Sequence, residues 1–107
     1  MDQANMNRTD WHLLGCFRVA GRLQHVTRAA EQLGTSQPAL SRSLARLQSD
    51  LGVQLFRRAA RSIRLTKPGE LFLSGVERAL EEIENGRREL GDFKAADRGT
   101  IALGFLR

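Results

Sequence analysis

The sequence contains few of the residues that build disulfide scaffolds or metal sites. Its single cysteine, Cys16, excludes an internal disulfide framework. Because Cys16 lies beside Leu14 and Phe17, we expect a buried thiol with no reactive role. The two histidines, His12 and His25, are thirteen residues apart, and no cysteine or carboxylate stands near them at metal-ligand spacing. We therefore expect no metal, and structural roles for both histidines.

Long apolar runs and enzyme motifs are also missing. No stretch approaches the about 20 apolar residues of a membrane span, and the first ten residues lack the apolar centre of a signal peptide. There is no phosphate-binding glycine loop, no nucleophile elbow and no pair of acids in a pocket-forming context. We expect a cytoplasmic protein that is not an enzyme and carries no cofactor in these residues.

The positive charge, by contrast, is concentrated in one block. The whole chain has a formal charge of +5. Residues 37–69 hold seven basic side chains and one acidic one, whereas residues 70–107 hold six basic and eight acidic ones. A local excess of arginine is the pattern expected for binding a polyanion, although ribosomal RNA or an anionic membrane would attract it equally.

Apolar periodicity predicts three short helices in the first half of the chain. The first is expected from Asp10, as its N-cap, to about Ala20, where Gly21 ends it. The second is expected from Thr27, as its N-cap, to Leu33, and the third from Ser36 to Leu51, each followed by a glycine. In the third helix, four leucines form a stripe that we expect to be buried: Leu40, Leu44, Leu47 and Leu51.

A hairpin and a long helix are expected to follow. Two strand-like pieces, Val53–Phe56 and Ser62–Leu65, flank an arginine-rich link and predict a two-stranded wing. The long helix is expected from Thr66, as its cap, to about Ala96, with an apolar seam at the about 3.5-residue period of a coiled coil. The expected seam and dimer interface consists of Phe72, Val76, Ala79, Leu80, Ile83, Gly86, Leu90 and Phe93. The ending, Thr100–Arg107, alternates like the start of a strand.

These elements predict a mainly α protein: a winged helix-turn-helix over residues 8–66 and a dimerising linker helix over residues 67–97. Residues 98–107 are expected to be a hinge and the start of a further domain. The small side chains Ala29 and Ala30 favour this arrangement, because the two helices of a helix-turn-helix cross closely.

The third helix carries the side chains expected to reach DNA bases. We expect Gln37 to pair with adenine edges and Arg42 to bind guanine or a phosphate. Ser41 can bind a base edge or a phosphate, and Pro38 offers an apolar surface to a thymine methyl. Arginines of the wing suit phosphates or the minor groove, and the Thr27 hydroxyl suits a phosphate at the helix start. The predicted DNA-binding residues are Thr27, Ser36, Gln37, Pro38, Ser41, Arg42, Arg46, Arg58, Arg61 and Arg64.

Simpler interpretations stand beside these roles. Gln37 and Ser41 are also ordinary residues for a solvated helix start, and Thr27 is also an ordinary cap. The wing arginines Arg57, Arg58, Arg61 and Arg64 also fit a solvated charge cluster. A protein-interaction adaptor, whose long helix binds partners and whose basic block is incidental, is the alternative function.

Residues 27–69, TRAAEQLGTSQPALSRSLARLQSDLGVQLFRRAARSIRLTKPG, closely resemble the DNA-binding domain of LysR-type transcription regulators. The resemblance covers about residues 8–105. It implies that Gln37, Pro38, Ser41 and Arg42 enter the major groove and that Arg61 reaches the minor groove. It also implies an antiparallel homodimer through the long helix, a tetramer in the full-length protein, and a C-terminal domain that binds a small-molecule effector. We expect the chain to be a truncated bacterial regulator that ends in the first strand of that domain.

Overall fold

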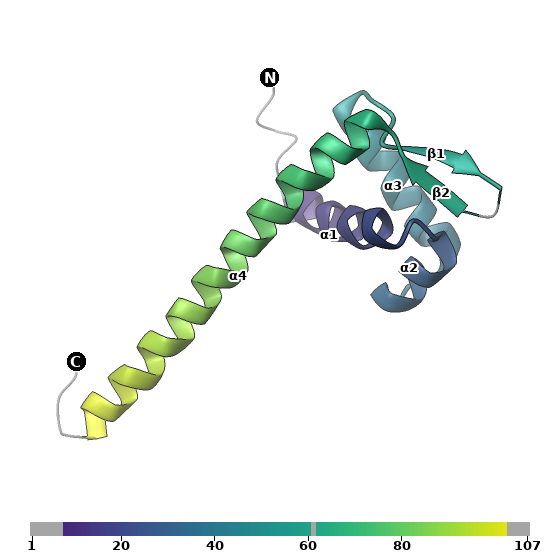
Figure 1. The fold of residues 1–107 in the computed structure, drawn as a ribbon. Helices are drawn as coiled ribbons and strands as arrows, with labels where there is room; N and C mark the ends of the chain where they lie inside the picture. The colour runs from purple at the N-terminus through teal and green to yellow at the C-terminus, as the bar shows by residue number, and fades with distance from the viewer. Residues whose placement is uncertain (1–7, 61, 103–107) are drawn as a thin grey trace. The chain divides into compact units, whose positions relative to one another are not determined.

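The computed structural model describes residues 8–60 and 62–102, with the side chains of residues 11–60 and 62–97. Four helices and one two-stranded sheet follow one another along the chain (Figure 1). Their bounds are α1 Arg8–Leu23, α2 Val26–Leu33, α3 Gln37–Leu51, β1 Phe56–Ala59, β2 Ser62–Leu65 and α4 Lys67–Ala102. The chain forms two compact units, Met1–Val76 and Glu77–Arg107, and α4 contributes to both. The architecture confirms the predicted winged helix-turn-helix followed by a long helix.

The core of the first unit is built from the apolar residues that the periodicity singled out. On α1, the buried side chains are Leu13, Cys16, Phe17 and Ala20. Ala29 and Ala30 of α2 are also buried, which confirms their predicted role in letting helices approach. Leu40, Leu44 and Leu47 of α3 complete this core, but Leu51 is 42% exposed, so its predicted burial was wrong.

The predicted limits of α1 were wrong at both ends. The helix begins at Arg8, so Asp10 lies inside it and is not its cap, and it continues through Gly21 to Leu23. Gly21 is helical and buried, and a Cβ atom there would lie 3.0 Å from a methyl group of Leu73. This glycine therefore serves a close approach to the start of α4 rather than a helix end.

The start of α2 also differs from the prediction. His25, not Thr27, is the N-cap, and its Nδ1 accepts a hydrogen bond from the Arg28 backbone N–H at 3.2 Å. Thr27 lies within the first turn. The other predicted ends hold, because Gly34 ends α2 and Gly52 ends α3 in the left-handed region, with φ of 69° and 73°.

The wing is an antiparallel hairpin whose second strand matches the prediction. Its first strand begins at Phe56 rather than Val53, so Arg57 and Arg58 lie within the strand. The preceding residues bond Thr66: the Thr66 N–H donates to the Leu55 carbonyl at 2.9 Å, and the Thr66 hydroxyl donates to the Gln54 carbonyl at 2.6 Å. The first bond continues the hairpin register by one pair, Leu55 opposite Thr66, and the second ties the Gln54 carbonyl to the entry of α4.

Thr66 caps α4 as predicted, because its hydroxyl oxygen accepts the Gly69 N–H at 3.0 Å. The helix then continues to Ala102, beyond the expected end at Ala96. The strand predicted from Thr100 was therefore wrong over residues 100–102, because α4 continues through Gly99. A single glycine within a helical pattern is tolerated and does not end the helix. Residues 103–107 of that prediction lie outside the described residues.

We predict opposite effects of alanine at two helical glycines. A Cβ atom at buried Gly69 would lie 2.1 Å from the Leu55 carbonyl oxygen, so Gly69→Ala should lower the free energy of unfolding by about 1–3 kcal/mol. A Cβ atom at Gly15 would meet nothing within 4 Å, so Gly15→Ala should raise it by about 0.5–1 kcal/mol. Urea unfolding followed by circular dichroism measures both, and a fully stable Gly69→Ala variant would contradict the close approach.

Candidate nucleic-acid interface

The first turns of α3 present polar side chains to solvent above a buried leucine stripe. Leu40 and Leu44 point into the core, at 1% and 7% exposure. Pro38, Ser41 and Arg42, which were predicted to contact bases from the opposite side, are exposed, and so is Gln37 at the N-terminal tip of the helix. The burial of one face thus fixes which face of the helix is free to bind.

A hydrogen bond joins the starts of α2 and α3. The Thr27 hydroxyl donates to the Gln37 Oε1 atom at 3.1 Å, and both side chains are exposed. This bond uses one lone pair of the amide oxygen, so the second lone pair and the NH₂ group of Gln37 remain available. Thr27 therefore orients Gln37, a role that its sequence position did not predict.

Two other predicted residues have partners of their own. The Ser36 hydroxyl oxygen accepts the Ala39 N–H at 3.2 Å and caps α3. Arg46 forms an ion pair with Asp50 at 3.9 Å, with the Arg46 side chain 55% exposed. An exposed pair of this length binds weakly, so the Arg46 guanidinium can exchange this carboxylate for another anion at little cost.

The wing places like charges opposite each other. Arg57 and Arg64 are directly paired across the hairpin, and both are exposed. Like charges at such a position are destabilising unless an anion neutralises them. Arg58 is exposed opposite Ile63. The remaining predicted wing residue, Arg61, lies outside the described residues.

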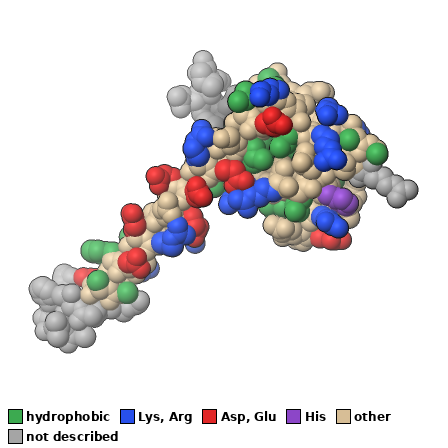
Figure 2. All heavy atoms as spheres, in the orientation of Figure 1, with side chains coloured by type: hydrophobic (Ala, Val, Ile, Leu, Met, Phe, Trp, Pro, Cys, Tyr) green, Lys and Arg blue, Asp and Glu red, His purple; other side chains and the backbone are tan. Residues whose placement is uncertain are grey.

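A groove between α3 and the wing brings together two of the predicted residues, Ser41 and Arg58. Ser41 and Ala45 line it from α3, and Arg57 and Arg58 line it from β1. The other lining residues are Val26, Leu44, Gln48, Phe56 and Ile63. Figure 2 shows several Lys and Arg side chains on the surface of this unit. One helix face and one arginine-bearing hairpin thus form a continuous surface.

Cys16 is buried away from this surface. Burial raises the pKa of the Cys16 thiol, and a hydrogen bond with Ser43 offsets part of that rise. The thiol lies 3.6 Å from the His12 Nε2 atom. Among the described residues, no three His, Cys, Asp or Glu side chains could hold a metal ion together. Cys16 is therefore a buried thiol, as predicted.

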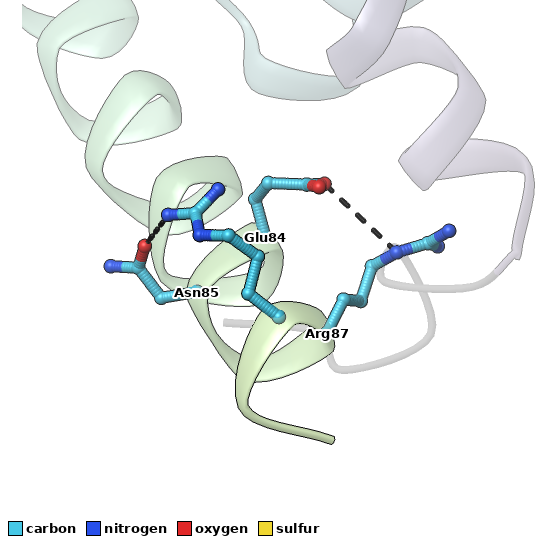
Figure 3. A network of polar contacts seen from close by, with 4 residues as sticks. Glu84, Asn85 and Arg87 are labelled. Atoms are coloured by element: carbon cyan, nitrogen blue, oxygen red, sulfur yellow. Dashed lines mark hydrogen bonds and ion pairs between the residues drawn. The ribbon is translucent and has the colours of Figure 1, made fainter. Parts of the chain in front are cut away.

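The second unit exposes apolar side chains between charged ones (Figure 2). Ile83, Leu90 and Phe93 are 43%, 60% and 65% exposed. Between them, Arg87 lies 3.9 Å from Glu84, and Arg88 donates to Asn85 (Figure 3). Contacts three residues apart are typical of a solvated helix surface.

Only part of the expected seam is exposed and free to contact a second helix. Phe72 packs its ring against that of Phe17, with centroids 5.4 Å apart, and Val76 is buried at 4% exposure in the same unit. Ala79 and Gly86 are exposed, and Leu80 is half-buried. Phe72 and Val76 thus serve the fold of their own protomer.

Sequence reasoning missed the capping role of His25. Thr27 is the more usual cap residue, and it stands only two positions further on. The only sequence signal for the true start of α2 was that His25 directly precedes the apolar residue Val26. Histidine is not among the preferred cap residues, so this signal did not outweigh Thr27. His25 sets where α2 begins, and so places Thr27 within reach of Gln37.

In the part of the chain that the structure describes, no helix combines the length and apolar character that crossing a bilayer requires.

Comparison with known proteins gives one consistent result. Residues 11–70 match the family model described as "Bacterial regulatory helix-turn-helix protein, lysR family". The chain is 45% identical over 97 residues to the uncharacterized HTH-type transcriptional regulator YybE of Bacillus subtilis, covering 91% of the chain and 33% of that relative. It is 40% identical over 80 residues to the HTH-type transcriptional regulator CysB of Burkholderia cenocepacia, covering 74% and 26%.

Solved structures agree with these matches. The chain superimposes on the CbnR DNA-binding domain in its DNA complex with a TM-score of 0.67 and 35% identity, covering 80% of this chain and 97% of that one. For the BenM DNA-binding domain bound to catB site 1 DNA, the TM-score is 0.73 at 28% identity, covering 78% and 92%. The chain spans between about a quarter and a third of the length of the curated relatives it matches.

Proposed function

Because the chain belongs to the lysR family of bacterial regulatory helix-turn-helix proteins, we propose that it binds double-stranded DNA sequence-specifically as the DNA-binding part of a transcription regulator. The observation that carries this proposal is the groove that Ser41 of α3 lines together with Arg57 and Arg58 of the wing, on the helix whose polar start is exposed. An α-helix fits the major groove, and arginine is drawn to the minor groove and to phosphates. The family and the named relatives are regulators, which agrees with the expectation that the chain is not an enzyme.

The helix start reads bases in the major groove. Arg42 donates to guanine or a phosphate, Ser41 contacts either, and Pro38 packs on a thymine methyl. Gln37 accepts the Thr27 hydroxyl through one lone pair of its amide oxygen, which orients the side chain. Its NH₂ group and the second lone pair of that oxygen remain for an adenine edge, as expected from the sequence.

The wing and its neighbours bind the backbone and the minor groove. The opposed Arg57 and Arg64 neutralise phosphates, which removes their mutual repulsion. Arg58 and Arg61 extend this contact toward the minor groove, and Arg46 supplies a further phosphate contact after leaving Asp50. Ser36 keeps its hydroxyl hydrogen available for a phosphate while it caps α3.

The protein acts as a homodimer through α4. Exposed Ile83, Leu90 and Phe93 lie at coiled-coil spacing and are covered by the same residues of a second copy, in the antiparallel arrangement implied by the family. The full regulator carries a C-terminal domain that binds a small-molecule effector, assembles as a tetramer and acts in the cytoplasm. Two copies then bind two half-sites about one or more helical turns apart.

The first test addresses base contact. Duplexes that the chain selects from a random pool should share a half-site, and Arg42→Ala should lose about 1–3 kcal/mol of discrimination between selected and random duplexes. Arg88→Ala, which removes an equal charge from α4, should not change discrimination. Equal losses on both duplexes would assign Arg42 to a phosphate, and no DNA retention at all would favour the adaptor alternative.

The second test addresses the wing. The logarithm of affinity should fall linearly with the logarithm of salt concentration, and each lost phosphate contact should flatten the slope by about 0.9. Arg64→Ala should flatten it by about that amount for each copy bound to the duplex, whereas Arg88→Ala should leave it unchanged. Fluorescence anisotropy with a mixed-sequence duplex measures both slopes. If Arg64→Ala and Arg88→Ala had the same slope, the wing would not contact the DNA.

The third test addresses the dimer. Leu90→Glu places a carboxylate in the apolar stripe and should shift the chain from dimer to monomer at tens of micromolar, about the concentration of a light-scattering experiment. Ala95→Glu adds the same charge on another face of the helix, where residue 95 is exposed, and should leave the dimer intact. A monomeric parent chain would contradict the proposed pairing.

A further inference from the structure

The wing has only two strands, so each strand has an outer edge of backbone N–H groups that no third strand bonds. A two-stranded hairpin is marginally stable by itself in water, and unpaired edge groups leave it free to shift. Two glutamine side chains from other elements bond these edges, one at each strand. Neither glutamine was singled out by the sequence.

Gln48 binds the edge at the start of β1. Its Oε1 atom accepts the Leu55 N–H at 2.7 Å and the Phe56 N–H at 3.0 Å. Gln48 lies on α3, seven residues after Ser41, and its side chain is half-buried in the groove between α3 and the wing. The helix that carries the proposed base contacts therefore holds β1 directly.

Gln24 binds the edge of β2. Its Oε1 atom accepts the Leu65 N–H at 3.0 Å, across 41 residues of sequence, and its backbone carbonyl accepts the Ile63 N–H at 3.4 Å. Gln24 directly follows α1 and has a φ of 49°, in the left-handed region that non-glycine residues rarely adopt. The junction between α1 and α2 thus holds the second strand.

We propose that Gln48 and Gln24 are positioning residues for DNA binding, which fix the wing relative to α3 by accepting the outer N–H groups of β1 and β2. This inference rests on the proposed contact between the wing arginines and DNA. Arg57 follows the two residues held by Gln48, and Arg64 lies between the two residues held by Gln24. The hydrogen bonds therefore fix the backbone on both sides of the opposed arginine pair.

Loss of one glutamine oxygen should release the wing without unfolding the helices. An N–H group left without an acceptor away from water is unfavourable, so the edge of the strand should open more often once the glutamine oxygen is removed. A released strand must be ordered again when DNA binds, and that cost lowers affinity. Base preference should persist, because α3 keeps its cap and its buried leucines.

The test compares three methionine variants of nearly equal side-chain length. Gln48→Met removes the side-chain oxygen that accepts the N–H groups at the start of β1. Gln24→Met removes the side-chain oxygen that accepts the Leu65 N–H of β2. Gln54→Met is the control, because residue 54 is exposed and its bonded group is the backbone carbonyl. Amide hydrogen exchange should accelerate about tenfold at Leu55 and Phe56 in Gln48→Met, and at Leu65 in Gln24→Met. Gln54→Met should change neither.

Binding is measured with a mixed-sequence duplex of about 30 base pairs and with the selected duplex. Both test variants should lose about tenfold in affinity with a flatter salt slope, while the ratio between the two duplexes stays within about twofold. Gln48→Glu supplies a carboxylate that also accepts both N–H groups, so it should restore slow exchange at Leu55 and Phe56. Restoration by glutamate separates the hydrogen bond from mere packing.

Several outcomes would overturn the inference. Exchange and salt slope equal to those of Gln54→Met would show that the glutamines do not hold the wing. Uniformly faster exchange throughout the helices would reduce them to general stability residues, and Gln48→Glu behaving like Gln48→Met would exclude the acceptor role. An unchanged slope in Arg64→Ala together with locally faster exchange in Gln48→Met would instead locate the failure in the proposed wing–DNA contact.

Discussion

The first unit depends on the ring of Phe17, which is fully buried and joins three elements that are distant in sequence. Its centroid lies 5.5 Å from that of Phe56 in β1, in an edge-on contact, and 5.4 Å from that of Phe72 in α4. Aromatic pairs at this distance add about 0.5–1.5 kcal/mol each beyond the apolar area they bury. The base of the wing and the start of the long helix are therefore attached to the helix that underlies the helix-turn-helix.

This attachment divides α4 between two roles. Phe72 and Val76 are used within the protomer, whereas Ile83, Leu90 and Phe93 of the second unit are exposed. An exposed apolar stripe on a charged helix is unfavourable in water, and pairing with a second copy removes it. The heptad pattern in the sequence is continuous, but its first residues, Phe72 and Val76, pack within the first unit. Only the later residues are expected to contact a second copy.

Much of this organisation is predictable from the sequence, because it follows from short-range periodicity. The leucine stripe of α3, its cap at Ser36 and the glycine ends of α2 and α3 all depend on residues within one or two turns. The exposed residues of α3 that we propose to contact DNA also follow, since burying Leu40 and Leu44 leaves the opposite face of the helix exposed. The family resemblance names the same positions.

The errors arose where a distant residue decides the local structure. Gly21 reads as a helix end, but it is helical because Leu73 approaches it. Val53 reads as strand, but the neighbouring carbonyls of Gln54 and Leu55 bond Thr66. Thr27 reads as a cap beside the true cap His25, and its hydroxyl instead reaches Gln37 ten residues away. Helix and strand propensities depend on neighbouring residues, so they could not predict these distant partners.

The same long-range bonds explain how a small domain can present two DNA-contacting elements as one surface. Gln48 lies on the helix that exposes Ser41 and Arg42, yet its amide oxygen bonds the first residue of the arginine-bearing strand. Ordering this strand during folding means that less conformational entropy is lost on binding. Because the wing is tied to α3 through the Gln48 bonds while α3 keeps its own buried leucines, a change that loosens the wing should weaken contact with the DNA backbone before it alters the choice of bases.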